Sequence, residues 1–221
     1  MAIARLTVWS DYLCPWCYNA AVRLERMEEE FGDLLEIEWR TFLLRPHPRG
    51  GPPGFPSVDD PPRRVSVEGL AKFARYTESW QRPAAEPDSG EFHLWDGETP
   101  PPSHSVPPHV AAKAAASLGA DAFRALHRRL LAAYFTENRD ITDRSTLTAL
   151  WAEAGLDGRD FDRCDDPAHL QETLKQHEEA ADNGVTGVPA AKMEGNEAII
   201  LGANPVELYR RWIQKKLDGK I

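Results

Sequence analysis

Two cysteines separated by two residues, in the segment Cys14-Pro15-Trp16-Cys17, constrain this chain more than any other sequence feature. The segment follows an apolar run at residues 3–9, typical of a buried strand, and opens a helical pattern at residues 15–31. Backbone N–H groups and the helix dipole stabilise a thiolate, the reactive form of cysteine, at a helix N-terminus. We therefore expect Cys14 to be the attacking thiol and Cys17, one turn further along, a more buried resolving thiol.

Zinc binding and a structural disulfide are the alternative uses of such a pair. Zinc needs further Cys or His ligands, and the third cysteine, Cys164, has no second Cys or His beside it. A bridge across two residues constrains the unfolded chain little, and a reducing cytoplasm disfavours it. Acidic neighbours raise the pKa of the Cys164 thiol and predict a passive role for it. Redox activity is thus the favoured interpretation, and we expect no metal site.

The remaining apolar patterns predict an α/β fold whose strands lie near the two ends of the chain. A second apolar run, at residues 35–44, completes a strand–helix–strand unit, and a helical crossover of this kind joins parallel strands. Strand patterns return only at residues 189–193 and 197–201, around a glycine-containing turn. A closing helix follows, with Asn204 as its expected N-cap and Pro205 in its first turn.

The middle of the chain is predicted to be helical. One helix is expected over residues 67–80, between proline- and glycine-rich loops at residues 46–62 and 83–108. Residues 109–183 have a strongly helical composition, and we expect four or five helices there without a strand. Asp143 is the expected N-cap of one of them.

Composition excludes several classes of partner. With 42% hydrophobic and 28% charged residues the chain is typical of a soluble globular protein, and its net charge of −9 disfavours nucleic acid and anionic membrane surfaces. No apolar stretch approaches the roughly 20 residues that cross a bilayer. The N-terminus lacks the pattern of a signal peptide, so we expect a cytoplasmic protein. The oligomeric state does not follow from these observations.

A second motif, Thr186-Gly187-Val188-Pro189, directly precedes a predicted strand. It resembles the cis-proline loop of thioredoxin-like proteins, which faces the active cysteines and offers backbone groups to an extended substrate. The resemblance implies a cis bond between Val188 and Pro189, although X–Pro bonds are usually trans. It also implies that both residues contact substrate.

Five segments together resemble the FrnE-like branch of the DsbA family. They are residues 10–18, 40–46, 155–157, 187–189 and 202–203. The resemblance runs across nearly the whole chain and implies a thioredoxin-like fold with an inserted α-helical domain. We accordingly assign residues 1–62, with the cysteine pair, and residues 184–221, with the proline loop, to a thioredoxin-like domain. The inserted helical domain spans residues 63–183.

The same resemblance implies disulfide exchange with protein or small-molecule thiols, in which Cys14 attacks and Cys17 resolves. The cysteine pair is itself the cofactor, and glutathione is a candidate redox partner. Trp16 lies between the cysteines and, with Pro15, is a candidate substrate contact. The periplasmic oxidants have histidine where this chain has Trp16, so strong oxidising power is not implied.

Two other functions stay open. Kappa-class glutathione transferases and 2-hydroxychromene-2-carboxylate isomerases share the inserted fold and use a serine near the position of Cys14. A non-catalytic module could instead hold a peptide along the Val188-Pro189 edge. Among lesser candidates, His104 and His109 fit either acid–base chemistry or packing, with packing favoured, and Trp39 is expected in the core.

Overall fold

The computed structural model describes residues 3–48, 54–56 and 64–221. Its strands form one mixed sheet in the order β2-β1-β3-β4. β1 and β2 are parallel neighbours, as predicted, whereas β3 runs antiparallel to both β1 and β4. The strands are β1 (Ala4–Ser10), β2 (Leu35–Thr41), β3 (Ala190–Met193) and β4 (Ile199–Leu201).

Helices α2 to α7 lie between β2 and β3 in the sequence, which confirms the predicted helical middle of the chain. The helices are α1 (Pro15–Phe31), α2 (Val67–Thr77), α3 (Gln81–Ala84), α4 (Val106–Ala116), α5 (Ala120–Phe135), α6 (Arg144–Glu153), α7 (Pro167–Asp182) and α8 (Val206–Leu217). Short 3-10 segments follow α1, α2 and α6. The predicted domain boundary at residues 62 and 63, like most of the loop at residues 46–62, lies outside the described residues.

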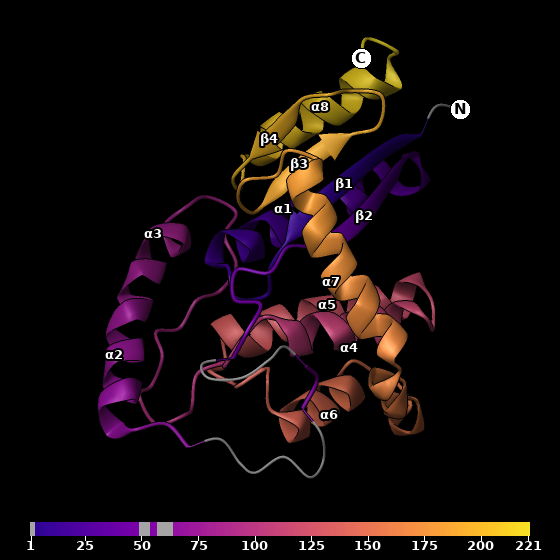
Figure 1. Cartoon of the computed structure of the whole chain (residues 1–221). Coiled ribbons are helices and arrows are strands. Elements are labelled where there is room, and N and C mark those ends of the chain that lie inside the picture. Colours follow the sequence, from indigo (N-terminus) through magenta and orange to yellow (C-terminus); the bar gives the residue numbers. More distant parts are fainter. Residues whose placement is uncertain (1–2, 49–53, 57–63) are drawn as a thin grey trace.

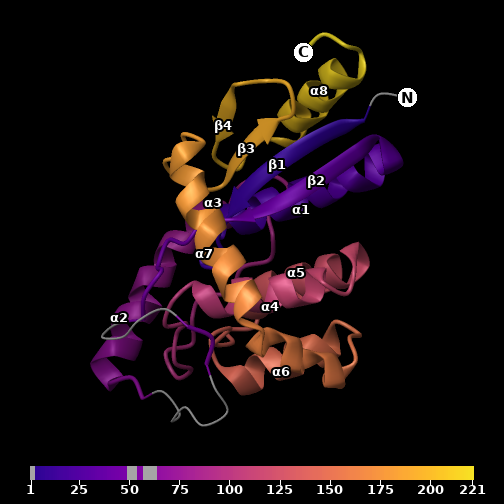
Figure 2. The same ribbon diagram turned by 45° about the vertical axis from the view of Figure 1, so that its right-hand side comes forward.

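Helices cover both faces of the sheet (Figures 1 and 2). Leu6 and Val8 of β1 share a buried cluster with residues of α1 and α8. Trp9, which points to the opposite face because side chains alternate along a strand, packs against Ala180 of α7. The period-2 pattern of β1 therefore determines which helices lie on which side.

A second core lies among the helices α4, α5 and α6, below the sheet in Figure 1. Its large members include Trp80, Phe135 and Trp151, each with no exposed surface. α2 and α3 form an arm at the side of this bundle (Figure 1). α5 also packs against α1, so the helical bundle contacts the helix that carries the cysteines.

Two boundaries differ from the predictions. α4 begins at Val106 and contains Pro107 and Pro108, which we expected to end a loop, because the first turn of a helix tolerates proline. Asn204 is not the N-cap of α8, since its side-chain amide donates to the carbonyls of Leu201 and Gly202 instead. The short helix α3 also overlaps the first two residues of the segment 83–108, which is predicted as loop.

Asp143 is the N-cap of α6, as predicted. Its carboxylate accepts a hydrogen bond from the Thr146 N–H at 2.8 Å. This bond satisfies one of the N–H groups that have no partner within the helix.

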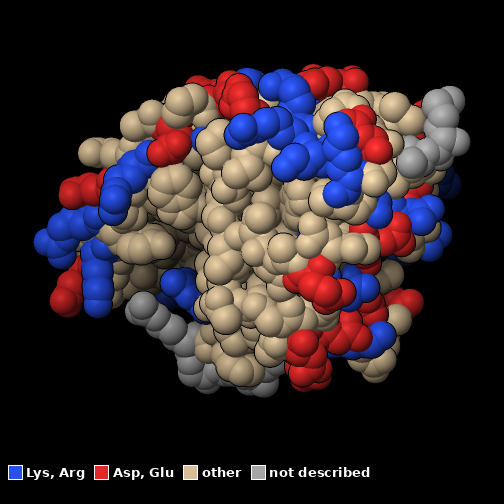
Figure 3. Space-filling model, turned by 90° about the horizontal axis from the view of Figure 1, so that it is seen from above, with Lys and Arg blue, Asp and Glu red and all other residues tan. Residues whose placement is uncertain are grey.

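Basic and acidic side chains are interspersed on the face shown in Figure 3. Many are paired, as in the Arg210–Glu30 contact at 2.7 Å between α8 and α1. None of the helices in the described part of the chain is long and apolar enough to cross a bilayer.

Candidate active site

Cys14 lies between the end of β1 and the first turn of α1, where it is the N-cap residue. Its N–H donates to the Asp11 carbonyl at 3.1 Å, and its own carbonyl accepts from the Cys17 N–H at 3.0 Å. Pro15 occupies the first turn without losing a hydrogen bond. The thiol therefore lies at the positive end of the helix dipole, as the sequence predicts.

The two active-site thiols lie in different surroundings, and both are free. Cys17 is fully buried, whereas Cys14 is 5% exposed. Burial, together with the neighbouring Cys14 thiol, raises the pKa of Cys17 well above its ordinary value. The Asp11 N–H donates to the Cys17 Sγ at 3.5 Å and partly opposes this rise.

The proline loop reaches Cys14 from the other end of the chain. The Val188–Pro189 peptide bond is cis, which confirms the expectation from the sequence. The Cys14 thiol donates to the Val188 carbonyl oxygen at 3.6 Å, across 174 positions of sequence. Antiparallel pairing of Trp9 with Ala190 holds the loop there, since β3 begins directly after Pro189.

The sequence-predicted site residues are therefore brought together in space. Pro15 and Trp16 are half-buried in the first turn of α1, next to the thiols in sequence. Val188 is half-buried and Pro189 is buried. Their contacts with a substrate stay a prediction.

Asp11 is a site residue that sequence reasoning missed. Its carboxylate is fully buried and accepts hydrogen bonds from the N–H groups of Leu13 at 2.6 Å and Leu44 at 2.7 Å. Burial raises the pKa of Asp11 to about 6, against the opposing effect of the Ser105 hydroxyl and these amides. Asp11 thus ties the loop before Cys14 to the end of β2. The only signal for it in the sequence is an acidic residue beside apolar residues at the end of a predicted strand.

The histidines support packing rather than acid–base chemistry at the thiols. His109 packs edge-on against Tyr12 at 4.8 Å between ring centroids, and burial holds its pKa well below the ordinary value. His104 contacts Ser103 at 2.8 Å through Nδ1 and the Gly54 carbonyl at 3.1 Å through Nε2. The two rings thus join the helical part of the chain to segments that precede it, at Tyr12 and Gly54.

Cys164 is a buried thiol in the core of the helical bundle. Burial raises its pKa to about 12, and the neighbouring acids, which we expected to dominate, contribute less. The passive role predicted for Cys164 agrees with this environment.

Trp39 is predicted in the core but is only half-buried, because it lies on the edge strand β2.

The described residues contain no group of three or more His, Cys, Asp or Glu side chains placed to hold a metal ion.

A family model described as a DSBA-like thioredoxin domain matches residues 5–214, nearly the whole chain. The chain belongs to this family. The DsbA-like family is one of thiol–disulfide oxidoreductases, and the predicted α/β thioredoxin-like fold class is confirmed. The narrower FrnE-like branch stays a prediction.

The sequence identity between this chain and individual proteins is low. The protein YwbO of Bacillus subtilis (strain 168), described as uncharacterized, is 29% identical over 225 residues, which cover 97% of this chain and 98% of YwbO. Its similarity extends over both chains almost completely.

Two solved structures illustrate the range of the fold. The cytosolic disulfide reductase DsbM of Pseudomonas aeruginosa, in a structure with GSH, has a TM-score of 0.71 and 22% identity, with 97% of this chain and 99% of DsbM covered. A 2-hydroxychromene-2-carboxylate isomerase has a TM-score of 0.64 and 17% identity, with 98% of this chain and 97% of the isomerase covered. At such identities the likeness concerns the fold alone.

Proposed function

We propose that this DsbA-family protein exchanges disulfides through a mixed disulfide on Cys14, which Cys17 resolves. The unequal environment of the two thiols carries the proposal. Cys14 lies at a helix N-terminus beside the Val188 carbonyl, while Cys17 is fully buried behind it. A first attacker must meet the substrate, whereas a resolving thiol needs only to reach Cys14.

In the reducing direction the Cys14 thiolate attacks one sulfur of a substrate disulfide. The S–S bond breaks, one substrate sulfur leaves as a thiolate, and the other stays bonded to Cys14. The thiolate released first takes the proton of the Cys17 thiol. The Cys17 sulfur, which accepts a hydrogen bond from the Asp11 N–H, then attacks Cys14 Sγ and releases the second substrate sulfur as a thiolate. The substrate gains two electrons, and the protein is left with a Cys14–Cys17 disulfide. The oxidising direction is the reverse.

We propose that Pro15, Trp16, Val188 and Pro189 contact the substrate. Val188 and Pro189 precede β3 directly, and the Val188 carbonyl lies beside the attacking sulfur. An extended peptide hydrogen-bonded to this backbone would present its sulfur to Cys14.

Protein and small-molecule thiols and disulfides, glutathione among them, are the proposed partners. The likeness to a cytosolic disulfide reductase solved with GSH supports this choice and a cytoplasmic location. The FrnE-like branch is proposed from the sequence motifs alone. No cofactor beyond the cysteine pair is proposed.

Single-cysteine variants test the proposal. Because Cys17 releases the bound partner, a Cys17→Ser variant should accumulate mixed disulfides that non-reducing electrophoresis and mass spectrometry detect. A Cys14→Ser variant should lose exchange activity to the background rate. Cys164→Ser is the matched control, since that thiol is buried in a separate core, and it should retain wild-type activity. Full activity in Cys14→Ser would refute the proposal.

Equilibration with mixtures of reduced and oxidised glutathione gives the direction of exchange. A reduction potential well below that of the cytosolic glutathione pool would make the protein a reductant, and one well above it an oxidant or isomerase. Glutathione conjugation or isomerisation that survives loss of both thiols would favour the transferase and isomerase alternative instead.

A further inference from the structure

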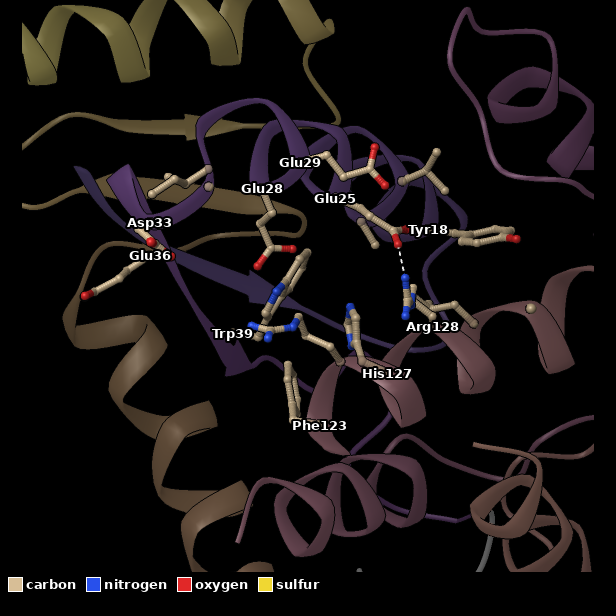
Figure 4. Close-up of a pocket in the computed structure, with 17 residues that line it drawn as sticks. Tyr18, Glu25, Glu28, Glu29, Asp33, Glu36, Trp39, Phe123, His127 and Arg128 are labelled. Carbon is tan, nitrogen blue, oxygen red and sulfur yellow. Dashed lines mark hydrogen bonds and ion pairs between the residues drawn. The ribbon is translucent and has the colours of Figure 1, made fainter. Parts of the chain in front are cut away.

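A cavity of about 740 Å³ lies between α1, the start of β2 and α5. Neither cysteine of the pair lines it, nor do Val188 and Pro189, so it is separate from the proposed active site. Figure 4 shows side chains of α5 facing those of α1 across it. Its volume falls in the range of sites that take small organic molecules.

Aromatic rings line one side of this cavity. His127 lies between Trp39, at 4.5 Å between ring centroids, and Phe123, at 5.3 Å and nearly parallel to it. The Nδ1 of His127 bonds to the Tyr12 hydroxyl at 2.8 Å, and its Nε2 has no hydrogen-bond partner among the described residues. Burial lowers the pKa of His127 to about 3, so the ring is neutral. The cavity therefore offers flat aromatic faces, while the Nε2 atom of His127 is itself buried.

The charged lining is acidic. Five carboxylates and two guanidinium groups line the cavity, an excess of three negative charges. Glu25 is paired with Arg128, and Glu36 with Arg5 outside the cavity.

Three lining carboxylates, those of Glu28, Glu29 and Asp33, have no hydrogen-bond or ion-pair partner among the described residues, and only Glu28 of the three is half-buried. The Glu28 side chain forms neither a hydrogen bond nor an ion pair with any residue in the described part of the chain, and burial raises its pKa, against the partly opposing attraction of Arg124 and Arg128. Arg124, the remaining guanidinium of the lining, is paired with Asp121 of its own helix. Figure 4 shows Glu28 directed from α1 towards Trp39. A half-buried anion beside an indole ring is a site for a cation, because the carboxylate attracts the charge and the ring face interacts with it favourably.

We propose that this cavity binds a small organic cation in which an amine is joined to a flat aromatic ring. The ring packs against Trp39 and Phe123, and the ammonium group binds the Glu28 carboxylate. An organic anion is disfavoured by the acidic excess. The described residues place no group of three or more His, Cys, Asp or Glu side chains to hold a bare metal ion.

Calorimetric titration with tryptamine tests this proposal on the wild-type protein. Indole-3-propionate is the matched probe, since it joins the same ring to a carboxylate instead of an amine. Tryptamine should bind about tenfold or more tightly than indole-3-propionate, and added salt should weaken it. Equal binding of both probes, or no tryptamine binding up to about 5 mM, would overturn the proposal.

Charge-matched variants assign the binding to the cavity. Glu28→Gln keeps the side-chain size and removes the charge, so tryptamine should bind at least about fivefold more weakly. Trp39→Leu should weaken it as well. Glu178→Gln makes the same change on the exposed surface of α7, outside the cavity, and should bind as the wild type does. Equal affinities in the Glu28→Gln and Glu178→Gln variants would contradict the proposal. The binding needs no thiol, so its outcome is independent of the proposed disulfide exchange.

Discussion

At the scale of single residues, this protein places groups of one chemical type in contrasting environments. Cys14 and Cys17 are three positions apart, yet the Cys14 thiol donates to the carbonyl of Val188 in the proline loop, and Cys17 is fully buried within α1. Asp11 is enclosed as well, and its carboxylate is held by two backbone amides rather than by an ion pair. Burial therefore determines the protonation chemistry of this loop more than the residue types do.

Asp11 should make stability depend on pH. Its pKa is about 6 in the folded protein against 3.8 as the ordinary value, so the folded state binds a proton more tightly than the unfolded state does. The contribution of Asp11 to the unfolding free energy is fully present below about pH 3.8 and is lost as the pH rises through about 6. At 1.36 kcal/mol per pKa unit, the loss is about 3 kcal/mol.

Urea unfolding of the wild type and of Asp11→Asn between pH 4 and pH 7 isolates this effect. The titration of the other groups contributes to both proteins and cancels in the difference between their unfolding free energies. The unfolding free energy of the wild type, relative to that of the variant, should fall by about 2–3 kcal/mol over the range. Parallel curves for the two proteins would show that Asp11 does not titrate there.

At the scale of elements, α1 is held by the segment that follows α3 as well as by the sheet. Gly90 donates its N–H to the Asn19 side chain at 3.0 Å, and Asn19 in turn donates to the Pro83 carbonyl at 2.8 Å. The ring of Tyr18 stacks on Phe135 of α5 at 5.3 Å. The first turns of the cysteine-bearing helix are thus packed from two directions.

Gly90→Ala should destabilise the protein by overpacking this contact. A Cβ at position 90 would lie 2.3 Å from the Tyr18 ring, so the stacked ring would have to move. The expected cost is about 1–3 kcal/mol in the unfolding free energy measured with urea. Gly158→Ala is the matched control, since a Cβ there meets nothing within 4 Å and its φ is not in the left-handed region. A cost equal to that of the control would contradict the packing argument.

At the scale of the whole molecule, one buried arginine joins three parts of the chain. Arg23 of α1 donates to the carbonyls of Ala203 at 2.6 Å and Asn204 at 3.2 Å, just before α8, and to that of Pro87 at 2.7 Å, after α3. The guanidinium fork reaches acceptors on two separate segments, which a single ammonium group cannot do.

Arg23→Lys should therefore lower the unfolding free energy by about 2–4 kcal/mol, since buried carbonyls lose their donors. Arg26→Lys is the control on the same helix, where the exposed side chain pairs only with Asp88, and it should cost less than about 0.5 kcal/mol. Both values come from urea unfolding in reducing buffer. A small loss of unfolding free energy in Arg23→Lys would contradict this argument. It would show that the carbonyls of Ala203, Asn204 and Pro87 find other donors or water.

Short-range sequence patterns were sufficient to predict strand β1, the start of helix α1 and the position of the cysteine pair at that helix start. Hydrophobic periodicity, a helix N-terminus and a proline before a strand each depend on a few consecutive residues. The same local reasoning misplaced the start of α4 and the cap of α8. Prolines fit a first turn as well as a loop, and the Asn204 amide found carbonyl acceptors that the sequence pattern does not show.

The sequence by itself determined the kind of fold and predicts which thiols react, because these inferences follow from residue type and short-range spacing. Only the tertiary structure decided that Asp11 is buried, that Tyr12 bonds to His127 across 115 positions, and that Glu28 lines a cavity beside Trp39. Desolvation and hydrogen bonding depend on which distant segments pack together. Spacing along the chain does not contain that information.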